Sequence, residues 1–90
     1  PAPAALTPDI VALARACDVA LELADAGAQT SGWKLSGHGW RVDARASLAA
    51  LLRWATALAA LAPPLGFEEL DLVADGDALR ARGLLFGRAG

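Results

Sequence analysis

Several residue types are scarce or missing in this 90-residue chain, and each absence removes a class of site. One Cys and one His are present, so no disulfide can form within the chain and the usual Cys/His zinc sets are out of reach. Met, Tyr and Asn are absent, and neither GxSxG nor HExxH occurs. A site of the acylphosphatase type, which pairs an Arg with an Asn, is excluded as well. We therefore expect no catalytic residues, no cofactor and no bound metal.

An excess of positive charge is also lacking. The formal net charge is −2 and the isoelectric point is about 5.1, which leaves no basic field to hold a phosphate backbone. RNA-binding sheets display aromatic residues on their central strands. Here the corresponding exposed positions are Arg41, Asp43 and Arg45. We expect no nucleic-acid partner.

Long apolar runs are missing despite a hydrophobic fraction of 56%, which Ala inflates. The longest apolar stretch is interrupted by Arg53 and closed by Pro63-Pro64. A membrane-spanning helix needs about 20 consecutive apolar residues. We expect no such span within the printed chain.

Two short stretches of the chain resemble each other, LELADAG at 21–27 and LDLVADG at 70–76, and they differ mainly by conservative exchanges and one transposed Asp. Each contains apolar and polar residues in alternation, which is typical of a half-buried strand. Each follows a helical pattern and precedes a second alternating stretch. The chain is therefore interpreted as an αββ unit used twice.

The first half predicts a helix over 8–16 and strands over 18–24 and 40–46. The stretch Thr7-Pro8-Asp9 is typical of a helix start, with the Thr7 hydroxyl as the cap. In the second predicted strand Trp40, Val42, Ala44 and Ala46 share the inner face. Residues 26–39 are rich in Gly, Ser, Thr and Gln and are interpreted as a long, partly mobile connection, in which 33–35 could lengthen one arm.

The second half opens with Ser47 as the cap of the strongest helix, which Pro63-Pro64 ends. Its apolar stripe comprises Leu48, Leu51, Leu52, Ala55, Leu58, Ala59 and Ala62. We expect Leu51, Leu52 and Leu58 in the core and Trp54 at its rim.

Two more strands and a tight turn follow. A strand over 68–74 has Leu70, Leu72 and Ala74 inward. Residues 75–77 form a hairpin turn, and the last strand covers 79–86, where Gly83 marks a bulge.

The two halves predict an α+β, ferredoxin-like domain in a circularly permuted αββαββ order, over residues 8–90. Neither half covers its own sheet face, so the halves join in a four-stranded sheet with both helices on one face. The first and third strands form the edges. Residues 1–7 are interpreted as a linker remnant, and we expect the chain to be a piece of a longer protein.

Charge follows the predicted strand positions. The central strands carry Arg41, Arg45, Arg80 and Arg82, and the edge strands carry Asp18, Glu22, Glu68, Glu69 and Asp71. Opposite charges across neighbouring strands stabilise a sheet modestly, and acids on an edge discourage stray strand addition. We take Arg41, Glu22, Glu69 and Asp71 as candidate partner-binding residues.

Four further features have a functional and a structural interpretation. His38 between two glycines is a ligand or base, or else a solvated loop residue, and the missing second ligand favours the latter. Cys17 lies on an apolar stripe and is interpreted as a small buried hydrophobe. Asp75-Gly76-Asp77 is a turn rather than a calcium loop, because the later acidic ligands are missing. Trp33 is an exposed candidate for partner binding, or else it folds back over the end of the helix layer.

The stretch SLAALLRWATALAALAPPLGFEELDLVADGDALRARGLLF, residues 47–86, resembles the second αββ unit of the periplasmic domain of GspM, an inner-membrane protein of the type II secretion system. The stretch IVALARACDVALELAD in the first half is also similar to that family and to its pilus relative PilO. The connection 26–39 departs from the shorter first hairpin that the family predicts. The related periplasmic domain of GspL is the nearest rival.

The resemblance implies a structural role in assembling an inner-membrane platform. It implies a transmembrane anchor upstream of Pro1, a domain in the periplasm, no cofactor, and a homodimer or a GspL-like partner. The alternative from another class is a small-molecule sensor of the ACT type, which also uses paired ferredoxin-like domains.

Overall fold

The computed structural model describes residues 3–89 of the chain, and its two halves have the same order of elements. The first half comprises the 3-10 helix η1 (Pro3–Leu6), α1 (Thr7–Ala16), β1 (Ala20–Thr30) and β2 (Ser36–Ala46). The second comprises α2 (Leu48–Ala59), β3 (Leu65–Asp75) and β4 (Ala78–Arg88). The predicted repeat of one helix and two strands is confirmed. Of the segment 1–7, residues 3–6 form η1 and Thr7 begins α1, while residues 1–2 lie outside the described part.

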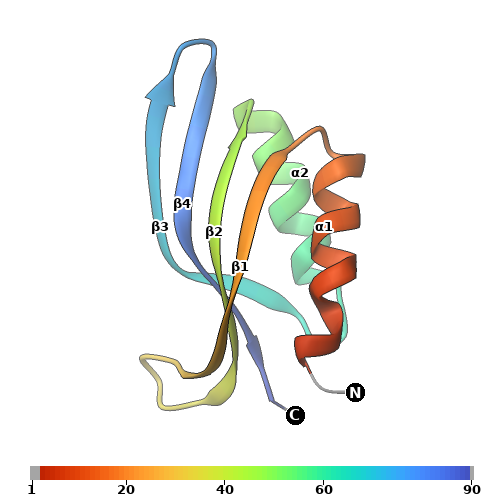
Figure 1. Ribbon diagram of the computed structural model, residues 1–90, viewed down its shortest axis with the longest axis vertical. Coiled ribbons are helices and arrows are strands. Elements are labelled where there is room, and N and C mark those ends of the chain that lie inside the picture. The colour runs from red at the N-terminus through yellow and green to blue at the C-terminus, as the bar shows by residue number, and fades with distance from the viewer. Residues whose placement is uncertain (1–2, 90) are drawn as a thin grey trace.

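All four strands belong to one antiparallel sheet in the order β1-β2-β4-β3. Figure 1 shows both helices on the same face of this sheet, which leaves the other face open. The predicted central pair and the predicted edges are therefore confirmed. The repeated stretches 21–27 and 70–76 lie on opposite edges of the sheet, as the first strand of each half.

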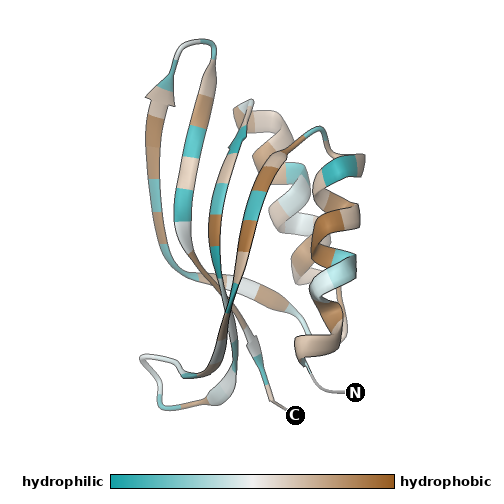
Figure 2. Cartoon of the chain, viewed as in Figure 1, coloured by the Kyte–Doolittle hydropathy of each residue, from teal (hydrophilic) through white to brown (hydrophobic). Residues whose placement is uncertain are grey.

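The core lies between the helices and the inner face of the sheet. Figure 2 shows the alternation of apolar and polar residues along the strands. Trp40, Val42, Ala44 and Ala46 are all buried, as the alternation predicted. Ile10, Ala14, Leu51, Trp54 and Leu58 pack on them from the helices. Burial of large side chains such as these is the main term that stabilises a domain of this size.

The two long helices begin differently. The Ser47 Oγ accepts a hydrogen bond from the Ala50 amide at 3.1 Å, so the predicted cap is confirmed. The predicted Thr7 cap is wrong, because η1 runs directly into α1 and the N-cap position is Leu6 in a helical conformation. The Thr7 hydroxyl donates instead to the Ala4 carbonyl at 3.1 Å and accepts from Trp40 Nε1 at 2.9 Å.

The buried face of α2 is rotated from the predicted one. Trp54 is 1% exposed rather than at the rim, and its Nε1 donates to the Ile10 carbonyl at 3.3 Å. Leu52, predicted to be core, is 59% exposed, and Leu48 is also exposed. The apolar stripe is wider than the surface that the sheet can cover, and the Trp54 ring occupies its centre. Leu51 and Leu58 are buried as predicted.

Most of the predicted connection 26–39 is strand. β1 continues to Thr30 and β2 begins at Ser36, so the loop is only 31–35. The register shifts between Asp25 and Gly27, where Gly27 has a φ of 72°. Small and polar side chains favour a loop in the sequence, but they do not prevent the backbone from pairing. Residues 33–35 belong to the loop and lengthen neither arm.

The predicted bulge at Gly83 is wrong, because the irregularity lies in the facing strand. The register of β3 against β4 shifts between Phe67 and Glu69, which leaves Glu68 as the extra residue. A Cβ at Gly83 would collide with the Glu69 carbonyl oxygen. Gly83 is therefore the position that lets the bulged backbone approach.

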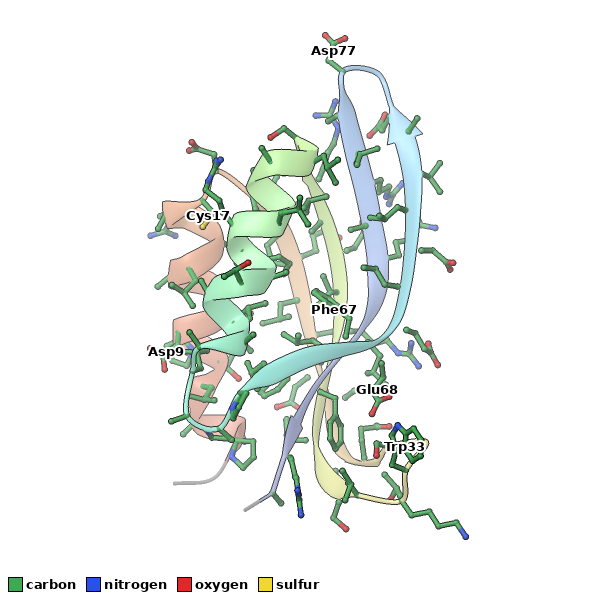
Figure 3. All side chains as sticks on the ribbon, turned by 180° about the vertical axis from the view of Figure 1, so that it is seen from behind. Asp9, Cys17, Trp33, Phe67, Glu68 and Asp77 are labelled. Atoms are coloured by element: carbon green, nitrogen blue, oxygen red, sulfur yellow. The ribbon has the colours of Figure 1, made fainter. Side chains whose placement is uncertain are left out.

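The β3–β4 hairpin closes where predicted, but the turn comprises only residues 76–77, because Asp75 is the last residue of β3. Asp75 pairs with Ala78, and Gly76 has a φ of 62°. Figure 3 shows Asp77 at the tip of this hairpin, beyond the helices. Glycine adopts this left-handed conformation without steric cost.

Candidate functional site

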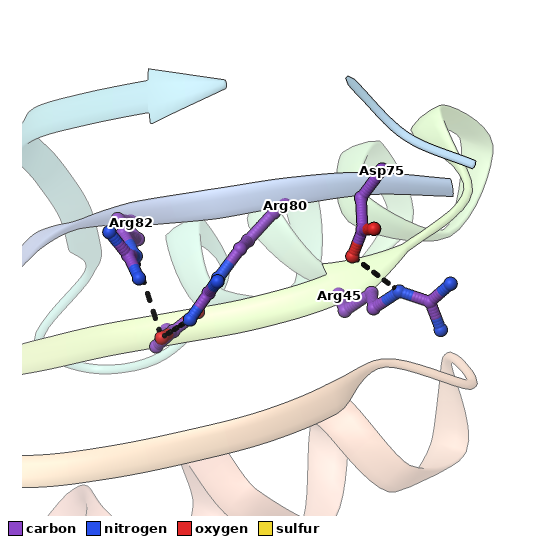
Figure 4. Close-up of polar contacts among 5 residues, drawn as sticks. Arg45, Asp75, Arg80 and Arg82 are labelled. Carbon is purple, nitrogen blue, oxygen red and sulfur yellow. Dashed lines mark hydrogen bonds and ion pairs between the residues drawn. The ribbon is translucent and has the colours of Figure 1, made fainter. Parts of the chain in front are cut away.

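The open face of the sheet carries the charged side chains of the central strands (Figure 4). Arg80 contacts the Asp43 carboxylate with two hydrogen bonds of 3.0 and 2.7 Å, and Arg82 lies 3.6 Å from the same carboxylate. Arg45 Nε donates to Asp75 Oδ2 at 2.7 Å. The hydrogen bond from Arg80 is the main cause that lowers the pKa of Asp43 below its ordinary value. The arginines and Asp75 are exposed and Asp43 is only partly buried, so each pair contributes little to the free energy of folding.

These ion pairs differ in part from the predicted pairing of central arginines with edge acids. Arg41 reaches Glu69 on the β3 edge at 3.4 Å, across the intervening β4, and Arg45 reaches Asp75 at the end of the same edge strand. Arg80 and Arg82, however, contact Asp43, which lies on the other central strand. Arg45 and Arg80 lie directly opposite each other. Their guanidinium groups turn to different carboxylates, which relieves the repulsion of like charges across the strand pair.

The five predicted partner-binding residues do not form one site. Glu69 and Asp71 lie on the β3 edge and Glu22 lies on β1 at the opposite edge, while Arg41 lies between them on β2 and reaches Glu69. Trp33 lies in the loop between β1 and β2. Among residues 3–89, Glu22 and Asp71 form no ion pair. Two separate edges therefore present free acids to a partner.

Trp33 is exposed, so the interpretation that it folds back over the helix layer is wrong. Its exposed fraction is 87%, and Figure 3 shows it near Glu68, at the end of the molecule away from the hairpin tip with Asp77. Trp33, Glu68 and Phe86 line a shallow hollow of about 380 Å³. Phe86 itself is buried, because the long β1–β2 hairpin covers the end of the open face where Gly37 lies against the Phe86 ring.

An apolar groove between α2 and β3 was not predicted as a surface feature. Its volume is about 80 Å³, and its lining is apolar throughout: Leu48, Leu51, Leu52, Trp54, Ala55, Phe67, Leu70, Leu72 and Ala81. Leu70 and Leu72 lie on the helix side of β3, as predicted, but they remain 46% and 50% exposed. The signal in the sequence was the width of the apolar stripe of α2, which exceeds what one sheet face can bury. We call this feature the α2–β3 groove.

The side chains of His38 and Cys17 are both partly buried. His38 lies on β2 with a side chain 17% exposed, so the interpretation as a solvated loop residue is wrong. Its ring packs 4.8 Å from the Trp40 ring, and its Nε2 lies 2.7 Å from Asp25 Oδ1. The angles of that approach do not meet those of a hydrogen bond, so the contact is an ion pair when the imidazole is protonated. Cys17 is partly buried and packs against the core.

Two kinds of site are not found in the part of the chain that the structure describes. Within residues 3–89, no three side chains of the His, Cys, Asp and Glu types gather to hold a metal ion. Over the same residues, no helix has both the length and the apolar character that a bilayer crossing requires. The described surface therefore offers ion pairs on the open face of the sheet and apolar side chains beside β3.

Comparison of this chain with protein-family models, with curated proteins and with solved structures finds no match.

Proposed function

We propose that this chain is a protein-association domain of a GspM-like inner-membrane protein of a type II secretion system, and that it acts in the periplasm. The observation that carries the proposal is the pair of acid-bearing sheet edges at β1 and β3, which no other element of the described chain pairs with. Exposed edges are the places where a second chain adds a strand. The resemblance of residues 47–86 to the GspM family supplies the cellular setting.

The fold that accompanies this proposal is the ferredoxin-like fold with its first strand moved to the end of the chain. The strand order β1-β2-β4-β3 and the helices on one face support it. In this arrangement the function comes from the surfaces of the sheet and requires no reactive group. No catalysis, cofactor or metal is part of the proposal.

The distribution of charge favours association over catalysis. Four arginines of the central strands are engaged by carboxylates across the open face. A catalytic site gathers titratable groups with shifted pKa values in a cleft. Here the shifted groups are Asp43 and Arg80, which neutralise each other on an exposed surface.

The partner is a second copy or a GspL-like periplasmic domain, with a membrane anchor upstream of Pro1. An ordinary interface covers about 800 Å² on each partner, a sizeable share of the 5374 Å² accessible surface of this domain. Because both edges are acidic, two copies repel each other there, and self-association is weak. A membrane anchor raises the effective concentration and compensates for that weakness.

Sedimentation of the domain over a concentration series, alone and with GspL-like and PilO-like periplasmic domains, tests the proposal. We expect self-association at micromolar or higher concentration and tighter binding to one of these partners. A strict monomer at millimolar concentration that binds none of them contradicts it. If that monomer gains thermal stability with a metabolite, the ACT-type sensor replaces the association domain.

A further inference from the structure

We propose that the β3 edge and the α2–β3 groove together bind an extended segment of a partner in which apolar residues alternate with Lys or Arg. This inference rests on the proposed function, and it names both the edge that is used and the chemistry of the partner. The argument has three parts: the two faces of β3, the charge left on its outer face, and the difference between β3 and β1.

The edge strand β3 has two chemically different faces. From the bulge onward its pairing with β4 is regular. Leu70, Leu72 and Ala74 lie on the helix side, and Glu69, Asp71, Val73 and Asp75 lie on the open side. A strand added beside β3 alternates with the same period of two. One set of its side chains therefore meets the apolar side of β3, and the other set meets the acids and the exposed Val73.

The helix side of β3 supplies an apolar binding surface. Leu48 and Leu52 of α2 and Leu70 and Leu72 of β3 are all about half exposed, and they line the same groove. Apolar side chains of an added strand would cover these four leucines and remove them from water. A continuous exposed apolar surface beside a sheet edge is a mark of an interaction site.

The open side supplies negative charge. Arg41 and Arg45 partly neutralise Glu69 and Asp75. Asp71 lies directly opposite Arg82, but Arg82 turns toward Asp43, and Asp71 forms no ion pair within residues 3–89. The edge therefore keeps a net negative charge that favours Lys or Arg in the added strand. Pairing with the β3 edge of a second copy would place acids near acids, which destabilises such a dimer.

The other edge lacks the apolar half of this arrangement. Glu22 gives β1 an exposed acid, but Leu21 and Leu23 are partly buried against the core. The hollow lined by Glu22 and Leu23 also contains Arg41 and Asp43 of β2, and it lies away from the helices. The β1 edge can thus pair a backbone without offering an apolar groove.

A capped synthetic peptide of about eight residues, alternating Val and Arg, tests this inference, since that length is ordinary for one strand. Titration into the 15N-labelled domain is expected to shift the amide signals of β3 and of the α2 residues at the groove, with saturation. Two control peptides are needed: one with Glu in place of Arg, and one with the same composition but all Arg at one end. Saturable binding of the blocked-order control with equal affinity, or signal changes confined to β1, would overturn the inference.

Two pairs of matched variants test the acidic side and the apolar side of the site separately. Asp71→Lys reverses a free charge at the β3 edge, and Glu22→Lys makes the same change at the β1 edge. We expect Asp71→Lys to weaken peptide binding about five-fold or more, and Glu22→Lys to change it less than about two-fold. Leu72→Ser is paired in the same way with Val11→Ser, an exposed apolar position on α1. Because all four positions are exposed, circular dichroism and thermal melts are expected to show that the variants fold.

The same variants distinguish this inference from the proposed function. If a platform domain binds and neither Asp71→Lys nor Leu72→Ser weakens it, the proposed function stands and the β3 edge is the wrong surface. If the Val/Arg peptide binds β3 as expected but no platform domain binds, the peptide-binding surface at β3 is confirmed and the proposed role in secretion is contradicted.

Discussion

Arg80 donates hydrogen bonds to both oxygens of the Asp43 carboxylate, with Nε 3.0 Å from Oδ1 and Nη2 2.7 Å from Oδ2. This bidentate contact links the two central strands on the open face. It favours the charged form of both partners, so it lowers the pKa of Asp43 and raises that of Arg80.

The pH dependence of stability follows from that contact. Because the folded-state pKa of Asp43 lies below its unfolded value of about 3.9, the contribution is complete above that value and is lost as pH falls through the folded pKa. We expect Asp43→Asn to lower the free energy of unfolding at pH 7 and to differ less from the wild type near pH 3. Urea titrations at several pH values measure this. Asp77→Asn, which removes an acid at the hairpin tip that forms no ion pair within residues 3–89, is the control, and an equal pH dependence in both variants would contradict the prediction.

The rotation of α2 predicts very different costs for two leucines of the same helix. Leu58 is 1% exposed, and Leu58→Ala is expected to cost about 2–5 kcal/mol of unfolding free energy. Leu52→Ala, at an exposed position of the α2–β3 groove, is expected to cost less than about 1 kcal/mol. Denaturant unfolding of the two variants compares them directly. Equal losses would mean that the groove is closed in solution.

The bulge in β3 makes one glycine sensitive to a single added carbon. Gly83→Ala places a Cβ against the Glu69 carbonyl oxygen, so β3 and β4 must separate locally, and we expect a loss of about 1–3 kcal/mol. Gly66→Ala in β3 is the matched control, because a Cβ there meets nothing within 4 Å. Its expected effect lies within about 0.5 kcal/mol. Thermal melts rank the two variants, and the reverse ranking would place the bulge elsewhere.

Acrylamide is expected to quench the fluorescence of the three tryptophans to very different extents. Trp40 and Trp54 are fully buried, whereas Trp33 is almost fully exposed. Trp33→Phe should remove most of the emission that acrylamide quenches and leave the unfolding midpoint nearly unchanged. Strong quenching that persists in the variant would show that Trp40 or Trp54 reaches solvent.

Much of the fold could be predicted from local periodicity. The alternation at Trp40 and Val42 fixed which face of β2 is buried, and the repeated αββ order led to the correct strand order. The hairpin at Gly76 was predictable because a two-residue turn requires a residue that adopts positive φ. These features depend on residues that are close together in the sequence.

Features that depend on distant partners could not be predicted in this way. The rotation of α2 depends on where the Trp54 ring meets Ile10, and the burial of His38 depends on its packing against Trp40. The bulge was assigned to Gly83 because the glycine is visible in the sequence, while the extra residue lies across the strand pair at Glu68. Of the candidate site, the acids of the edges were predicted, and the groove beside them was not. The ion pairs of Arg80 and Arg82 were missed because strand register decides which carboxylate lies nearest.

The extra residue at Glu68 sets the phase of everything that follows it in β3. Phe67 and Leu70 both face the helices although they are three positions apart, which a regular strand forbids. Because Glu68 is the unpaired residue, deleting it would place Glu69 directly after Phe67, where it already pairs with Leu84, and Leu70 and Leu72 would keep facing the helices. Deletion of Glu68 is therefore expected to remove the bulge and preserve the faces of β3, whereas deletion of a paired residue such as Asp71 would reverse the faces of the residues beyond it. The stretch LDLVADG faces the same way as its counterpart LELADAG because Glu68 is left out of the pairing.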